Sequence, residues 1–244
     1  MHLFFNNKVV NDIGNSNKEH REKWLKKTLL KLGKGKRILD AGAGELQYKK
    51  YCKHLRYVSQ DFGQYSGEGD GIGLQMGGWD NSKLDIVSDI LDIPVKDKSF
   101  DAIMCVEVLE HIPYPDKAIK EFARIIKSNG KLIITAPFCS MTHFSPYFYS
   151  TGFSKYWYEE VLKKHGFEIE EISYNGNYFE YYAQETRRLY YMAEKYTNTN
   201  LALKRKNIKL IEGMLSLLDK INAKQKKSEE MMCFGIHILA RKVS

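Results

Sequence analysis

The sequence predicts an α/β fold: a doubly wound, Rossmann-like sheet of seven strands, mostly parallel, with the last strand antiparallel and a helical insert between strands six and seven. Short apolar runs typical of strands alternate with helix-like segments, and this order produces a parallel sheet with helices on both faces. A glycine-containing turn directly follows the first apolar run. A long stretch without proline separates the last two strands.

The elements follow one another in a regular order. An N-terminal helix is expected over residues 18–35, because apolar side chains recur at helical spacing from Trp24 to Leu32, and Gly33 and Gly35 then end it. Strands are expected over 37–41, 57–61, 85–89, 100–108, 131–138, 166–174 and 232–241, and helix-like stretches over 46–54, 115–127 and 154–165.

The helical insert over residues 176–230 carries two apolar stripes. One repeats at 3-4-3 spacing, and the second lies beside it. A helix that is apolar over so wide an arc is expected to be covered on two sides, by the body and by another helix or subunit, so the insert is a candidate homodimer interface. The stripes are Ile208, Ile211, Leu215 and Leu218, and Leu210, Met214, Leu217 and Ile221.

Length and composition favour a single domain over residues 1–244, with 43% hydrophobic residues. The net charge is +8, and residues 18–36 and 201–227 supply +12 of positive charge between them. Both segments are helix-like, so solvated helix faces are favoured over a nucleic-acid patch. No apolar run reaches about 18 residues, which predicts no membrane span. Four dispersed cysteines, without a CxxC pair or a secretory signal, favour a reducing cytoplasm.

The turn after the first strand reads Asp40-Ala41-Gly42-Ala43-Gly44. Ligands of doubly wound sheets bind at the carboxyl ends of the strands, and glycine lets the backbone approach them closely. Asp61, 21 residues beyond Asp40, is placed to take a ribose hydroxyl. Gln47 occupies the third glycine position of a dinucleotide motif, and Asp40 would repel a pyrophosphate. A cofactor with an ammonium and a sulfonium, S-adenosylmethionine, suits this turn better than a nicotinamide dinucleotide.

Five segments over residues 37–175 together resemble the class I S-adenosylmethionine-dependent methyltransferases, particularly the large "type 11" group. They read LDAGAG, QD, SDI, SFDAIMCVEVLEHI and GKLIITAPF. The resemblance implies a methyltransferase domain that binds S-adenosylmethionine. It implies that the methionine part lies against Asp40, Ala41, Gly42 and Gly44, the ribose against Asp61 and Phe62, the adenine against Asp89 and Ile90, and the methyl-donor pocket against Glu107 and Val108.

Residues 62–84 depart from that family's pattern, which places a helix here. They contain seven glycines in 23 positions and no helical periodicity. A loop this long is more often a functional lid than a linker, so we expect it to close over cofactor or acceptor with Trp79 as its anchor. The alternative is a merely mobile loop.

Two histidines are candidates for catalysis, because methyl transfer to an oxygen requires a proton to be removed. His111 follows the fourth strand and His143 the fifth, and His143 is the stronger candidate. Aromatic residues after His143 are expected to lower its pKa by desolvation and keep the imidazole neutral. No metal site is expected.

The acceptor is expected to be a hydroxyl of a small molecule or saccharide. Aromatic side chains after the fifth and sixth strands suit the walls of a sugar site. The His-x-x-Pro-Tyr segment resembles methyltransferases that accompany bacterial glycan assembly. Three alternatives stay open: a nucleic-acid (RNA) methyltransferase, a non-catalytic cofactor-binding module and a nicotinamide enzyme. Against the nucleic-acid methyltransferase, the sequence has no Asn/Asp-Pro-Pro-Tyr segment and no Pro-Cys nucleophile after strand four.

Overall fold

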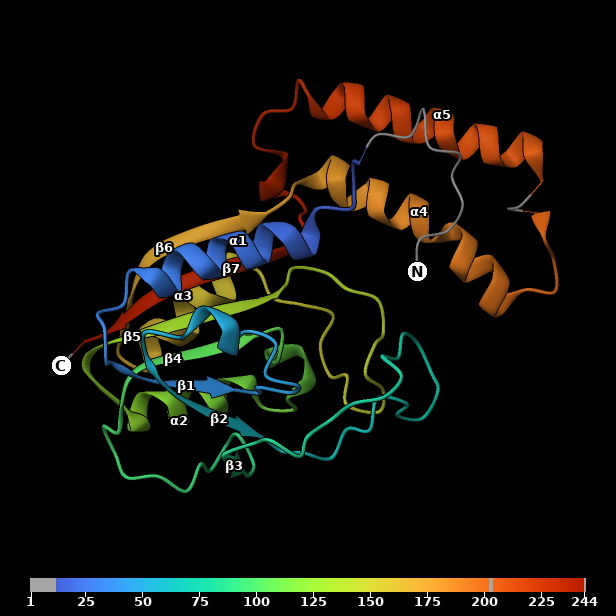
Figure 1. Cartoon of the computed structure of the whole chain (residues 1–244). Helices are drawn as coiled ribbons and strands as arrows, with labels where there is room; N and C mark the ends of the chain where they lie inside the picture. The colour runs from blue at the N-terminus through green and yellow to red at the C-terminus, as the bar shows by residue number, and fades with distance from the viewer. Residues whose placement is uncertain (1–11, 202–203, 244) are drawn as a thin grey trace. The chain divides into compact units, whose positions relative to one another are not determined.

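The computed structural model describes residues 12–201 and 204–243 (Figure 1). These residues form two compact units, each described separately below. One unit comprises residues 12–20, 174–201 and 204–234, and the other comprises residues 21–173 and 235–243.

A seven-stranded sheet is the centre of the second unit, and its order is β3-β2-β1-β4-β5-β7-β6. Neighbouring strands from β3 to β5 are parallel, whereas β7 runs antiparallel to β5. The predicted sheet is therefore confirmed. The strands are β1 (Arg37–Ala41), β2 (Arg56–Asp61), β3 (Ile86–Val87), β4 (Phe100–Val106), β5 (Ile126–Pro137), β6 (Phe167–Asn175) and β7 (Gly235–Lys242).

Helices cover both faces of the sheet, with α1 on one side and α2 on the other (Figure 1). α1 (Asn17–Leu30) buries Trp24, Leu25 and Leu29. Strand side chains complete that apolar cluster: Ile38, Ala102, Met104, Val106 and Ile133. α2 (Pro115–Ile125) begins with a proline at its first turn, where the missing N–H costs nothing, and it packs beside α3 (Lys155–Lys164).

Some element boundaries differ from the sequence expectation. Residues 46–54 were expected to be helical but contain only a 3-10 turn, η1 (Lys49–Tyr51). Leu46 has φ +61°, which an α-helix cannot include, and Tyr48 and Cys52 are buried in the α1 cluster. β4 ends at Val106 rather than at residue 108, because Glu107 has φ +55°.

The third strand is also shorter than expected, with two residues instead of five. The Asp85 carboxylate takes the place of strand pairing before it. Its Oδ2 accepts hydrogen bonds from the Ser59 N–H at 2.9 Å and the Ser59 hydroxyl at 2.8 Å.

The other unit contains the expected insert, with α4 (Tyr178–Tyr196), α5 (Arg205–Asn222) and the 3-10 turn η4 (Ser228–Glu230). Asn177 caps α4 by accepting a hydrogen bond from the Phe179 N–H at 2.9 Å. The unit's apolar core comprises Ile13, Ala183, Tyr190, Ile211, Leu215 and Leu218.

The second stripe of α5 is exposed, although a cover on two sides was expected. Within the described chain, nothing buries Leu210, Met214, Leu217 or Ile221. Among residues 12–201 and 204–243, no helix has both the length and the apolar character needed to cross a bilayer.

Candidate active site

The carboxyl ends of β1, β2, β3 and β4 meet at one edge of the sheet. Asp40 of β1 lies opposite Ser59 of β2 and Met104 of β4, and Asp61 of β2 lies opposite Val87 of β3. The four segments that were expected to bind the cofactor therefore lie side by side.

Main-chain hydrogen bonds fix the turn after β1. The N–H groups of Gly42 and Ala43 donate to the Gln60 carbonyl at 2.8 and 2.9 Å. The Asp61 carboxylate accepts the Gly44 N–H at 3.0 Å on Oδ2 and the Gly63 N–H at 3.0 Å on Oδ1. Asp61 is thereby held rigidly with its carboxylate at the strand end.

The two glycines of the turn are required by close neighbours. Gly42 has φ +76°, and a Cβ there would lie 2.4 Å from Cγ2 of Val108. Gly44 has φ +49°, and a Cβ there would lie 2.5 Å from the Trp79 ring. Each glycine therefore lets another part of the predicted site approach the turn.

Asp40 is buried at the end of β1, and its Oδ2 accepts a hydrogen bond from the Tyr57 hydroxyl at 2.5 Å. Burial raises the pKa of Asp40 to about 7; the Tyr57 hydrogen bond opposes this rise, and the negative charge of Asp61 adds to it. A cation bound beside Asp40 would relieve this unfavourable burial.

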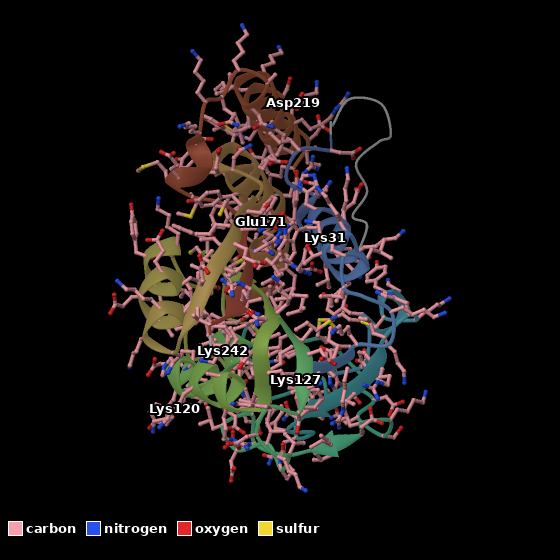
Figure 2. All side chains as sticks on the ribbon, turned by 90° about the vertical axis from the view of Figure 1, so that its left-hand side faces the viewer. Lys31, Lys120, Lys127, Glu171, Asp219 and Lys242 are labelled. Atoms are coloured by element: carbon pink, nitrogen blue, oxygen red, sulfur yellow. The ribbon has the colours of Figure 1, made fainter. Side chains whose placement is uncertain are left out.

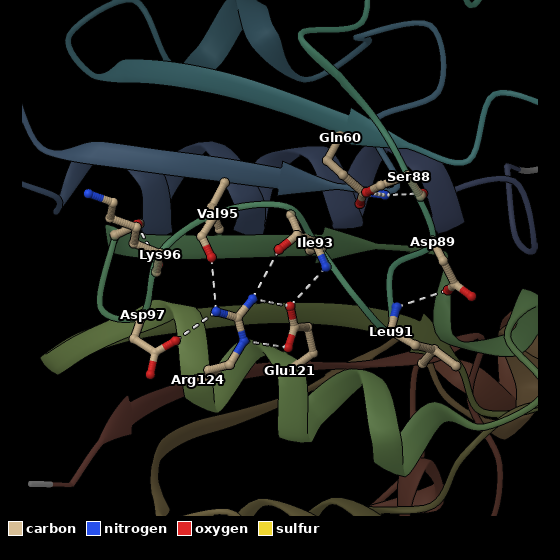
Figure 3. Close-up of polar contacts among 11 residues, drawn as sticks. Gln60, Ser88, Asp89, Leu91, Ile93, Val95, Lys96, Asp97, Glu121 and Arg124 are labelled. Carbon is tan, nitrogen blue, oxygen red and sulfur yellow. Dashed lines mark hydrogen bonds and ion pairs between the residues drawn. The ribbon is translucent and has the colours of Figure 1, made fainter.

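A salt-bridge network on α2 holds the segment after β3, which carries Asp89 and Ile90 (Figure 3). The Arg124 guanidinium donates to the carbonyls of Ile93 and Val95 at 3.0 and 2.9 Å. It also forms a two-pronged pair with Glu121, at 2.8 and 2.6 Å. This network anchors the segment that follows the predicted adenine site. Sequence reasoning missed Arg124, although its i,i+3 spacing from Glu121 was readable.

Glu107 is held between two partners directly after β4. The Thr135 hydroxyl donates to Oε1 at 2.8 Å, and the Arg21 guanidinium lies 3.1 Å from Oε2. Burial raises the pKa of Glu107 although Arg21 opposes the rise. Its φ of +55° is a strained value for glutamate, as often found at functional sites.

Glu110, His111 and His143 form a cluster beyond Glu107, with Glu110 and His111 in the 3-10 turn η2 (Leu109–His111). The Nε2 atoms of His111 and His143 lie 3.7 and 3.8 Å from Oε1 of Glu110. These distances exceed hydrogen-bond range. Glu110 is completely buried, and no described residue donates a hydrogen bond to either of its carboxylate oxygens.

Both imidazoles of the cluster are oriented by main-chain carbonyls. Nδ1 of His111 lies 2.6 Å from the Tyr147 carbonyl, and Nδ1 of His143 lies 2.8 Å from the Met141 carbonyl. A carbonyl only accepts, so Nδ1 carries the proton in each neutral ring and Nε2 carries the lone pair. Both lone pairs are therefore available on the nitrogens nearest Glu110.

The pKa of His143 differs from the expectation. Burial lowers it, but the Glu110 carboxylate and the Met141 carbonyl outweigh burial, so the pKa is raised. The expectation of a lowered pKa was wrong because it considered only the aromatic neighbours. Burial does lower the pKa of His111, where Glu110 opposes the fall.

The glycine-rich segment 62–84 pairs with the loop that carries His143. The Leu74 N–H donates to the Thr142 carbonyl at 2.9 Å, and the Phe144 N–H donates to the Leu74 carbonyl at 3.0 Å. The Trp79 ring packs edge-on against Phe144, with centroids 5.4 Å apart. The segment thus connects the turn at Gly44 with the histidine cluster.

Asp101 lies at the opposite, amino end of β4, away from this cluster in the strand. It accepts a hydrogen bond from the Arg37 N–H at 2.8 Å and pairs with Lys127 at 2.9 Å. These contacts support a structural role for Asp101. Directly after α1, Lys31 lies 3.7 Å from Glu171, so one charge of the basic segment 18–36 is paired within the unit (Figure 2).

Residues 39–134 match the family model described as a methyltransferase domain. The chain thus carries a class I S-adenosylmethionine-dependent methyltransferase domain over these residues. The chain is 32% identical over 122 residues to the ubiquinone biosynthesis O-methyltransferase of Coxiella burnetii. This match covers 48% of the chain and 49% of that protein. The chain is 49% identical over 49 residues to an uncharacterised protein of Methanocaldococcus jannaschii, a match that covers 20% of the chain and 21% of that protein.

The methyltransferase fold also appears in solved structures. An S-adenosylmethionine-dependent methyltransferase from Archaeoglobus fulgidus superposes with a TM-score of 0.56 at 16% identity, covering 95% of this chain and 97% of that one. This likeness concerns the fold alone. The chain spans no more than about half the length of the curated relatives named above.

The candidate site thus contains residues that the sequence indicated and residues that it did not. The predicted cofactor segments and both predicted histidines lie at strand ends. Phe62 packs edge-on against Tyr147, with centroids 4.9 Å apart, in the same loop region as His143. Sequence reasoning missed Glu110 and Arg21. A glutamate beside a histidine in EVLEHI was the only available signal for Glu110.

Proposed function

We propose that the chain transfers the methyl group of S-adenosylmethionine to a hydroxyl of a small molecule or saccharide. The single observation that carries this proposal is the position of the Glu110–His111–His143 cluster. It follows β4 and β5, next to the strand ends that carry the predicted cofactor residues. The Coxiella burnetii relative, named as an O-methyltransferase, supports an oxygen acceptor.

The residues at the strand ends fit this cofactor. Asp40 is a buried carboxylate with a raised pKa, and an ammonium group beside it would stabilise its ionised form. Asp61 is fixed by two main-chain N–H groups and would accept from the ribose hydroxyls. We assign Ala41, Gly42, Gly44 and Phe62 to the methionine and ribose parts, Asp89 and Ile90 to the adenine, and Glu107 and Val108 to the methyl-donor pocket.

The bound cofactor supplies an electrophilic methyl group on a sulfonium. The protein must therefore position the acceptor in line and exclude water. We propose that His143 and His111 hold the hydroxyl through their Nε2 atoms and that His143 takes up its proton. The Glu110 carboxylate, 3.8 Å from Nε2 of His143, would stabilise the imidazolium that forms.

We also propose that residues 62–84 act as a lid. Support comes from the contacts of Trp79, whose ring lies against Gly44 and against Phe144. A segment with these two contacts would exclude water from both the cofactor and the acceptor hydroxyl. The alternative of a merely mobile loop is opposed by the pairing of Leu74 with His143.

Two further proposals concern the setting of the enzyme. The exposed stripe of Leu210, Met214, Leu217 and Ile221 on α5 supports a homodimer through the insert, and light scattering should then give twice the chain mass. A reducing, cytoplasmic setting is supported by the thiol of Cys52, whose pKa burial raises to about 12, typical of an unreactive thiol.

The cofactor assignment predicts a pH-dependent affinity. Ionised Asp40 attracts the ammonium group, and its pKa in the free protein is raised to about 7, so binding should weaken as the pH falls through 7. We expect S-adenosylmethionine to bind roughly tenfold more weakly at pH 6 than at pH 8. Calorimetry at both values is the measurement.

Asp40→Asn is the matched control, because the amide cannot ionise. Its affinity should be lower at pH 8 and should lose most of the pH dependence. If the affinity of this variant depends on pH as that of the wild type does, Asp40 is not part of the cofactor site. Tighter binding of NAD than of S-adenosylmethionine would overturn the proposed function. A screen of hydroxyl compounds with a labelled methyl group then tests the acceptor class.

A further inference from the structure

We propose that Glu110, His111 and His143 bind one divalent transition-metal ion, and that this ion holds the acceptor hydroxyl. The second half of this statement rests on the proposed function, whereas the first half does not. No metal-ligand spacing was evident in the sequence, because His143 lies far along the chain from the adjacent pair of Glu110 and His111.

The geometry of the three side chains suits an ion. One carboxylate oxygen and two Nε2 atoms all lie within 4.8 Å of one another. Ligand atoms on one tetrahedral zinc ion are about 3.3 Å apart, since each bond is about 2.0–2.1 Å. The Nε2 atoms of His111 and His143 lie 3.7 and 3.8 Å from Oε1 of Glu110. Side-chain movements of about 0.5–1.5 Å would therefore bring all three atoms to the separation of ligands on one ion.

The burial of Glu110 favours a cation beside its carboxylate. A buried carboxylate without hydrogen bonds is strongly unfavourable, and no described residue donates to either oxygen of Glu110. The guanidinium of Arg21 pairs with a different carboxylate, that of Glu107, at 3.1 Å. An imidazolium at position 143 would close to about 2.7–2.9 Å in a charge-assisted hydrogen bond. The observed 3.8 Å is longer than that hydrogen bond and about 0.5 Å longer than the separation of two ligands on one zinc ion.

The orientation of the imidazoles is that of metal ligands. Metal-binding histidines usually donate their second ring N–H to a carbonyl or carboxylate, which fixes the tautomer and the ring. His111 and His143 both do so through Nδ1. His165 provides a contrast within the chain, because its Nε2 binds Asp116 directly at 2.8 Å and leaves no space for an ion.

The ligand set indicates the class of ion. Imidazole favours zinc, iron, cobalt and other transition metals over magnesium and calcium, which prefer oxygen ligands. Three protein ligands also leave coordination positions open, as in catalytic rather than structural sites. An alcohol oxygen in an open position would have a lowered pKa. With Nε2 of His143 bound to the ion, the hydroxyl proton would leave to water and no longer to His143. The O–CH₃ bond would form as the S–CH₃ bond breaks, and the electron pair would stay on sulfur.

The test is metal binding by the full chain after chelator dialysis. We expect calorimetry to give one Zn²⁺ per chain and cobalt substitution to give the visible bands of a low-coordinate site. Glu110→Gln and His143→Asn should each weaken Zn²⁺ binding by about 100-fold or more. His165→Asn is the matched control, because it removes a histidine–carboxylate pair outside the cluster, and it should bind as the wild type does.

A stability measurement distinguishes a loss of Zn²⁺ binding from a loss of folding in these variants. The metal-free Glu110→Gln protein should melt at or above the wild-type temperature, because an amide replaces an unpaired buried charge. Zn²⁺ should raise the melting temperature of the wild type and of His165→Asn but not of Glu110→Gln. Equal Zn²⁺ affinity in the wild type and the two cluster variants would overturn the site.

The metal proposal and the proposed function can fail separately. S-adenosylmethionine titrations of the same proteins report on the proposed function, and Zn²⁺ titrations report on the cluster. Full turnover by chelated protein would overturn the role of the ion at the hydroxyl. Loss of turnover on chelation and its return with Zn²⁺ would support that role.

Discussion

His143→Ala is expected to lower kcat by about 10²–10⁴-fold while the affinity for S-adenosylmethionine stays within a few-fold. The Nε2 of His143 is directed at the Glu110 cluster and not at the turn after β1, so the loss should concern the acceptor. Both proposed roles predict this result, because the ring either takes up the proton or holds the ion. Single-turnover kinetics with saturating cofactor is the measurement.

His165→Ala is the control for the loss of a partly buried imidazole, and it should leave kcat unchanged. His111→Ala should lower activity and also stability, since Nδ1 of His111 ties η2 to the Tyr147 carbonyl. A wild-type kcat for His143→Ala would show that the imidazole is only part of the wall of the site.

Gly42→Val should weaken S-adenosylmethionine binding by on the order of 100-fold or more. A Cβ at residue 42 would lie 2.4 Å from Val108, so either the turn after β1 or Val108 must move. Both belong to the predicted cofactor pocket. Backbone strain at φ +76° adds a cost of about 1–3 kcal/mol to the free energy of folding.

Gly35→Val is a close control for this substitution. Gly35 has the same φ of +76°, but a Cβ there meets nothing within 4 Å. Its melting temperature therefore measures the backbone strain alone, and its cofactor affinity should remain that of the wild type. If Gly42→Val and Gly35→Val bind the cofactor equally well, the turn after β1 is not the cofactor site.

The sheet was predictable because each strand is an apolar run bounded by turn residues, and the carboxyl ends of parallel strands meet at one edge. The predicted cofactor segments follow from that rule. The local backbone conformation was harder to predict from the sequence. A helix was expected from residue 46 because the composition allows it, whereas packing of Tyr48 and Cys52 and the left-handed Leu46 prevent it.

The histidine cluster was predictable only in part. Strand ends place His111 and His143 near each other, but the meeting of His143 with Glu110 depends on the loop after β5. That loop is fixed by the pairing of Leu74 with His143, a long-range contact that no periodicity reveals. The direction of the His143 pKa depends on the same contact, because the buried charge of Glu110 outweighs desolvation.

β7 is the last strand of the sheet to be synthesised. It follows the helical unit in the chain but lies inside the sheet, between β5 and β6. During translation, residues 131–137 of β5 therefore leave the ribosome before their antiparallel partner exists. An unpaired apolar strand edge invites pairing with other chains. The nascent protein is thus most exposed to aggregation before residue 242 is made, and the sheet can close only afterwards.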